Sequence, residues 1–208
     1  MTNTTTDRHD RDWRRKTRQV RALAWLSLTW LTLEGGLGLA AGLAAGSIAL
    51  VSWALGSVIE GLASIIVLWR FTGSRTLSET AERGAQRAVA ISFWLLAPYI
   101  AVEAVHDLWT HQHAETTVLG IVVTASSVMI MPWLGIVKRR LGRQLGSGAT
   151  AGEGTQNLMC AAQGAAVLIG LGVNAAFGLW WLDPVIALLL AGWAVREGFA
   201  GWKAEGCC

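Results

Sequence analysis

Long apolar runs alternate with short polar segments along almost the whole chain. Six runs have about the 20 mostly apolar residues that a helix needs to cross the hydrocarbon core of a membrane. They cover residues 22–45, 47–69, 88–109, 117–137, 158–178 and 182–199. The pattern therefore predicts an all-α polytopic membrane protein with six transmembrane helices.

The positive charges predict how these helices are oriented. All 17 Lys and Arg residues lie in residues 8–21, 70–87, 138–143 and 196–203, so they occupy every second polar segment. Cytoplasmic segments keep Lys and Arg, and translocated segments shed them. We therefore expect both termini in the cytoplasm. Because the outer segments are short, we also expect antiparallel hairpins of spans 1 and 2, 3 and 4, and 5 and 6.

The domain organisation that follows is simple. Residues 1–21 form a basic cytoplasmic segment, residues 22–202 a six-helix transmembrane domain, and residues 203–208 a short cytoplasmic tail. Residues 139–154 are rich in glycine and predict a flexible linker that lets spans 5 and 6 move relative to spans 1 to 4.

Composition agrees with a membrane protein and excludes other classes. A mean hydropathy of +0.44 with 53% hydrophobic and 15% charged residues is unlike a soluble domain. The net charge of +3 is better explained by basic residues that face anionic headgroups than by nucleic acid, since no nucleic-acid-binding motif accompanies it. The composition and the apolar runs predict an integral protein, which we place in the plasma membrane. No enzyme motif is present, so we expect neither enzymatic activity nor a prosthetic group.

Two acidic residues lie in the middle of predicted spans. Glu34 is 13 residues beyond Arg21, and Glu60 is 10 residues before Arg70. At 1.5 Å per residue both would lie roughly 15–20 Å from the cytoplasmic boundary. Carboxylates at such depth usually mark an ion or proton path, which predicts a shared chamber. The alternative is that each is protonated and hydrogen-bonds a Ser, Thr or Trp of another helix.

A second polar set opens the fifth span. Glu153, Gln156 and Cys160 are spaced i, i+3 and i+7, so they share one helical face. A carboxylate, a carboxamide and a thiol are plausible ligands for a divalent metal of borderline softness. The alternative is that Cys160 is only a small hydrophobic residue and that Glu153 is a helix-start residue.

Gly38, Gly42 and Gly46 form a stripe of small residues on the first span. Such stripes let helix backbones approach closely in lipid. We favour packing within the chain over a contact between two chains.

Two stretches of the sequence resemble the cation diffusion facilitator (cation efflux) family. One is the sequence AGSIAL at residues 45–50, followed by Glu60. The other is VLIG at residues 167–170, followed by WLDPV at residues 181–185. The resemblance covers nearly the whole chain and corresponds to a short form that lacks the family's C-terminal cytoplasmic domain.

The resemblance implies a transport site of two residues from the second helix and two from the fifth. Carried over, these are Gly56 with Glu60, and Gln156 with Cys160. Gly56 departs from the family pattern, which has Asp or His there. Tail-less members carry Gln and Cys in the fifth helix and an acid that corresponds to Glu153. The family also implies a homodimer.

The predicted function is divalent metal cation transport, of the zinc efflux type, by metal/proton antiport. Glu60, Gln156 and Cys160 would hold the ion, with Glu153 at the cytoplasmic mouth and Glu34 assisting. Desolvation favours the protonated form of a carboxyl group, and a bound cation displaces that proton. The alternative function is that of a degenerate family member that binds a metal ion or a partner membrane protein without transport, which Gly56 favours.

Overall fold

The computed structural model describes residues 3–45, 48–110 and 118–203, and these form helices joined by short turns. The elements are α1 (Asn3–Ala45), α2 (Ile48–Arg70), the 3-10 helix η1 (Gly73–Leu77), α3 (Glu79–Thr110), α4 (Val118–Leu145), α5 (Gly148–Phe177) and α6 (Leu182–Lys203). No strand occurs in the described ranges. The all-α prediction is confirmed for this part of the chain.

The described helices are those of an integral membrane protein. Four of them contain segments long and apolar enough to cross a membrane, namely Glu79–Thr110, Ile121–Leu145, Gly148–Asn174 and Pro184–Lys203. Large apolar side chains also cover their outer surface, with Val102, Met129 and Leu189 among the most exposed. Such a surface requires a lipid environment rather than water. The count of six spans and the cytoplasmic side of the termini stay predictions.

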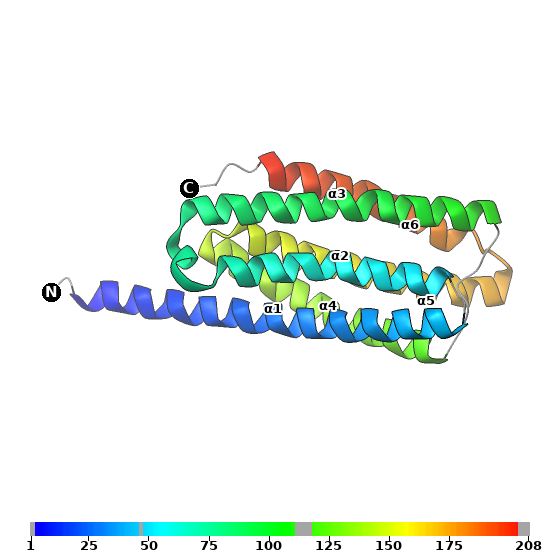
Figure 1. Ribbon diagram of the computed structural model, residues 1–208, viewed down its shortest axis with the longest axis horizontal. Coiled ribbons are helices and arrows are strands. Elements are labelled where there is room, and N and C mark those ends of the chain that lie inside the picture. The colour runs from blue at the N-terminus through cyan, green and yellow to red at the C-terminus, as the bar shows by residue number, and fades with distance from the viewer. Residues whose placement is uncertain (1–2, 46–47, 111–117, 204–208) are drawn as a thin grey trace.

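The six long helices lie side by side (Figure 1). The start of α1, the end of α6, η1 and the turn between α4 and α5 all lie at one end. We call this the basic end, because it carries Arg75, Arg143 and Lys203. Helix α1 has 43 residues, about 65 Å at 1.5 Å per residue, and projects beyond the other helices there (Figure 1). The predicted N-terminal segment therefore continues without a break into the first predicted span.

The helices pair differently from the prediction in one respect. Helix α1 packs on α2, α4 on α5 and α3 on α6, and α5 also contacts α6. The expected hairpin of the third and fourth spans is wrong for the described residues, because α3 also packs on α2 and α5, whereas α4 packs on α5 and α1. A short connection keeps only the linked ends close. The packing partner of a helix in lipid depends on which small residues allow close approach.

The expected flexible linker at residues 139–154 is also wrong. This stretch is helical except for Gly146 and Ser147. Gly146 has a φ of 63°, a left-handed conformation that suits glycine at a helix end. Ser147 then caps α5, because its Oγ accepts a hydrogen bond from Thr150 N at 3.2 Å.

Two of the other glycines of this stretch serve close packing of α4 on α5, and the remaining two, Gly148 and Gly152, face α3. A Cβ atom on Gly142 would lie 2.7 Å from Ala151 N, and one on Gly154 would lie 2.8 Å from Gly135 O. Only glycine lets the two backbones approach this closely. The glycine content that predicted a linker therefore comes from tightly packed helices.

Candidate metal centre

The predicted shared chamber brings together polar side chains from α1, α2 and α5. Glu34 and Glu60 are 3% and 7% exposed, so both are buried inside the bundle. Glu60 lies beside the thiol of Cys160. Glu34 is close enough to interact electrostatically with both of them. Three of the five predicted site residues therefore lie in one region.

Glu34 also takes part in hydrogen bonds that join α1 to α4. Ser127 Oγ lies 3.1 Å from Glu34 Oε2 and donates to it. Trp30 Nε1 donates to the same hydroxyl at 3.0 Å. The bond from Ser127, on α4, is of the kind that the alternative interpretation of Glu34 expects, a carboxyl group bonded to a Ser of another helix. Glu34 therefore suits an assisting role better than that of a principal ligand.

Gln156 lies one helical turn before Cys160 and is anchored to α3. Its Nε2 donates to Ser92 Oγ at 2.8 Å, and that hydroxyl donates to Val89 O at 2.7 Å. The other end of the amide, Gln156 Oε1, is buried with no hydrogen-bond partner among the described residues, and the same holds for Glu60 Oε2. Buried acceptors without a partner are rare in folded proteins. These two oxygens are free to bind a cation.

The structure does not bring Glu153 into this group. Its Oε1 lies 2.6 Å from Lys138 Nζ, and the two side chains are 2% and 0% exposed. Lys138 Nζ also donates to Ser27 Oγ at 2.6 Å and to Asn157 Oδ1 at 3.2 Å. Glu153 is thus the partner of a buried lysine.

Sequence reasoning missed Lys138, because it assigned all Lys and Arg residues to cytoplasmic segments. A signal was available in the spacing of Leu134, Lys138 and Leu141. The steps of four and three residues put Lys138 on the apolar face of α4, and all three are buried. Arg139 and Arg140 fall off this face and are exposed.

At Gly56, where the family pattern has an acid or His, the neighbouring space is filled by an aromatic ring. A Cβ atom there would lie 3.3 Å from Cε1 of Tyr99, which belongs to α3. Within the described ranges, no three or more His, Cys, Asp or Glu side chains are arranged to hold a metal ion. A metal ion bound by Glu60 and Cys160 therefore needs the amide oxygen of Gln156, water, or a shift of Glu34 to complete its coordination.

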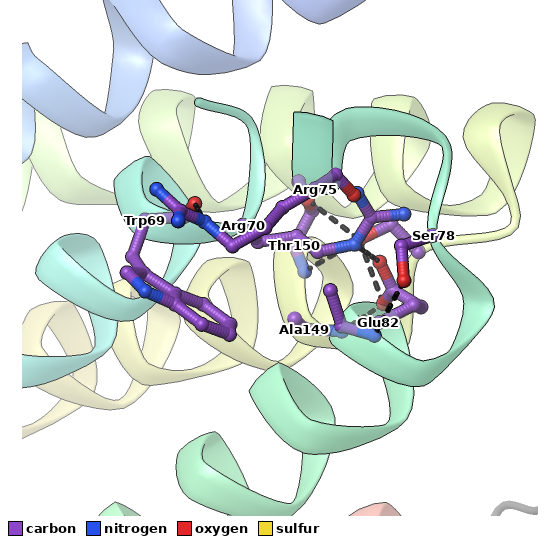
Figure 2. Close-up of polar contacts among 9 residues, drawn as sticks. Trp69, Arg70, Arg75, Ser78, Glu82, Ala149 and Thr150 are labelled. Atoms are coloured by element: carbon purple, nitrogen blue, oxygen red, sulfur yellow. Dashed lines mark hydrogen bonds and ion pairs between the residues drawn. The ribbon is translucent and has the colours of Figure 1, made fainter. Parts of the chain in front are cut away.

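At the basic end, a polar cluster joins α2, α3 and α5 (Figure 2). Arg70 Nε donates to Glu82 Oε2 at 2.7 Å. Glu82 Oε1 accepts from Ser147 Oγ at 3.0 Å and from Ala149 N at 3.1 Å. An acid at a helix N-terminus also interacts favourably with the helix dipole. This cluster fixes the start of α5, and so the direction in which Gln156 and Cys160 enter the bundle.

A cavity of about 280 Å³ opens near the same end, between α3, α4, α5 and α6. Its lining includes Phe93 and Thr155, which are the sequence neighbours of the hydrogen-bonded pair Ser92 and Gln156. The cavity therefore comes within one residue of Gln156 along α5.

Comparison with known proteins supports the resemblance seen in the sequence. Residues 24–200 match the family model described as the cation efflux transmembrane domain. Transmembrane protein 163 of Xenopus laevis is 28% identical over 140 residues, which cover 66% of this chain and 50% of that protein. The chain thus spans about half the length of this curated relative.

Proposed function

The chain belongs to the cation efflux family, and we propose that it is a divalent metal cation transporter that exports zinc or a similar ion in exchange for protons. Glu60, Gln156 and Cys160 are the proposed ligands, and Glu34 assists them. Glu153 stands on the cytoplasmic side of these ligands. Only its Oε2 is open to an ion, because its Oε1 is bonded to Lys138.

The observation that carries the proposal is the pair of unpartnered acceptors beside a thiol. Glu60 Oε2 and Gln156 Oε1 are buried without hydrogen bonds, and Cys160 contacts Glu60. A buried acceptor costs free energy unless something compensates it, and a bound cation would supply that compensation. A carboxylate, an amide oxygen and a sulfur together suit a metal of borderline softness such as zinc.

The contact between Glu60 and Cys160 supports coupling to protons. A carboxyl group and a thiol that lie side by side inside the bundle hold at least one proton between them when no metal is bound, because two adjacent negative charges disfavour each other. Metal ligands bind in their deprotonated forms, so an arriving ion releases that proton at the place where it binds. Proton and metal then occupy one site alternately, which is the requirement for antiport.

The remaining parts of the proposal concern the assembly. We propose six spans in the plasma membrane with both termini cytoplasmic, as the basic residues favour, and a homodimer, as the family implies. Gly38 is already buried within the single chain, which favours intrachain packing for its part of the glycine stripe. Gly46 lies outside the described residues, and so does the burial of Gly42.

The second candidate function is a family member that binds metal or a partner protein without transport. Gly56 favours it, because the position offers no ligand and the ring of Tyr99 lies against it. This candidate predicts that the protein binds zinc but moves none.

The test is zinc flux into proteoliposomes under an imposed pH gradient, with wild type, Glu60→Ala and a control. The control is Glu79→Ala, which removes an exposed acid from the start of α3. We expect wild type and the control to move zinc and Glu60→Ala to lose at least about nine-tenths of the rate, because one charged contact contributes roughly 1.5–3 kcal/mol. Equal flux through wild type and Glu60→Ala would refute the mechanism, and no flux with intact zinc binding would favour the second candidate.

A further inference from the structure

The ammonium group of Lys138 lies in a cage of oxygen atoms inside the bundle. Its side chain is 0% exposed. Nζ lies 2.6 Å from Ser27 Oγ on α1, 2.6 Å from Glu153 Oε1 and 3.2 Å from Asn157 Oδ1, both on α5. A lysine ammonium has three N–H donors and no acceptor. The three oxygens therefore satisfy it completely as a cation.

Part of the cage is held together without the lysine. Asn157 Nδ2 donates to Ser27 Oγ at 3.3 Å and also contacts Met131 Sδ at 2.9 Å. This bond links α5 to α1 and fixes two of the three oxygens relative to each other. Glu153 Oε2 is buried with no partner among the described side chains. Two of the three oxygens thus keep their relative positions without Lys138, and the Glu153 carboxylate has one spare acceptor.

Stability alone is a weak explanation for this arrangement. A buried ion pair is often no more stabilising than well-packed apolar residues of the same volume, because both charges lose their hydration. A carboxylate, an amide oxygen and a hydroxyl are also the ligand types that hard metal cations prefer. With one carboxylate, the cage carries a single negative charge, which a monovalent cation balances.

Along α5, the cage lies between the basic end and the proposed metal ligands. Glu153 precedes Cys160 by seven residues on one face of α5, which places it about 10 Å nearer the basic end. An ion that followed this face would pass the cage before it reached Glu60.

We propose that Ser27, Glu153 and Asn157 form a binding site for a monovalent cation, which the chain fills with its own ammonium group, Lys138. The charge of Glu153 is then neutralised before any ion enters from the basic end. A divalent ion consequently meets its first uncompensated carboxylate at Glu60. Removal of the Lys138 side chain opens the site to ammonium or potassium ions from solution.

The test is thermal unfolding of the full chain in detergent micelles, with a chelator present to remove divalent metals. Wild type and Lys138→Ala are compared in ammonium, potassium and N-methylglucamine chloride at one ionic strength. We expect the unfolding midpoint of Lys138→Ala to rise saturably, by about 3–6 °C at ten times the dissociation constant, in ammonium or potassium only. Wild type should show no difference between the salts.

Two controls separate the cage from general salt effects. Arg140→Ala removes the same charge from an exposed position two residues away and should behave as wild type. Lys138→Ala/Glu153→Gln removes the carboxylate and should lose the gain. If Lys138→Ala folds only with ammonium or potassium, the proposal is supported.

Three outcomes would overturn the proposal. They are equal midpoints of Lys138→Ala in all three salts, an undiminished gain in the double variant, and failure of Lys138→Ala to fold in any salt. Because divalent metals are absent, none of these outcomes depends on whether the protein transports zinc.

Discussion

Gly56 is the position at which the ligand set implied by the family resemblance has no side chain. It precedes Glu60 by four residues, so a side chain there would lie on the same face of α2 as the Glu60 carboxylate. The ring of Tyr99 lies against the position, 3.3 Å from where a Cβ atom would be. A new side chain therefore fits only if this ring yields by a few tenths of an ångström.

We predict that Gly56→Asp raises the affinity for zinc by at least about tenfold. The added carboxylate would supply a fourth ligand, and a charged contact contributes about 1.5–3 kcal/mol. The measurement is competition of the purified protein with a chromophoric zinc chelator. Gly56→Asn is the matched control, since it presses on Tyr99 in the same way but adds no charge. Equal affinities of the Asp and Asn variants would show that position 56 does not face the ion.

The sequence predicted the neighbours of a residue when only its depth in the membrane mattered. Counting residues from Arg21 and Arg70 put Glu34 and Glu60 at one level, and the structure brings both near Cys160. The partner of Glu153 could not be found in this way. Lys138 was counted with the basic segment that follows it, because a count of charges does not show which side of a helix each one occupies.

At the scale of elements, the close pairing of α4 and α5 determines how the proposed ligands of α5 are held. The contact consists of backbone against backbone where glycines face each other. A Cβ atom on Gly154 would lie 2.8 Å from Gly135 O and 2.9 Å from Arg139 N. Backbone atoms of a packed helix cannot move aside as the end of a flexible side chain can.

We predict that Gly154→Ala lowers the free energy of unfolding by about 1–3 kcal/mol, the usual cost of overpacking a core. Gly84→Ala is the control, because it lies in α3 with nothing within 4 Å of its added Cβ atom. That control should gain about 0.5–1 kcal/mol, since alanine favours a helix over glycine. The free energies of unfolding of both variants and of wild type are measured in detergent micelles. A Gly154→Ala protein as stable as Gly84→Ala would show that the helices are not in close contact.

The elements themselves were predictable, but their ends were not. Runs of apolar residues identified the helices, because crossing a membrane requires length and hydropathy together. The glycines of residues 139–154 were interpreted as a linker, although only Gly146 and Ser147 leave the helical conformation. Glycine composition is the same for a flexible segment and for a close helix contact. Only the partner helix distinguishes the two.

For the whole molecule, the fold class followed from the sequence and the packing arrangement did not. Helix α3 packs on α6 rather than on α4, to which it is directly connected. In lipid, apolar surface alone favours no particular neighbour, so the choice depends on the shapes of facing surfaces. Those shapes are set by residues of different helices that meet in space, such as Gly135 and Gly154. A single sequence does not show which residues meet.

The orientation of the whole molecule gives the last prediction. The turn that contains Ser74 lies at the basic end, and the turn that contains Leu179 lies at the opposite end (Figure 1). Both residues are exposed. Because cytoplasmic segments keep positive charge, Ser74→Cys should react with a membrane-impermeant maleimide only after cells are permeabilised, and Leu179→Cys should react in intact cells. Both are made in a background without the native cysteines, and Ala63→Cys, at a fully buried position, should not react in either condition.

The reverse pattern of labelling would invert the orientation and place Glu153 on the outer side of Glu60. Labelling of both turns from one side would mean that the helices between them do not carry the chain across the membrane an odd number of times.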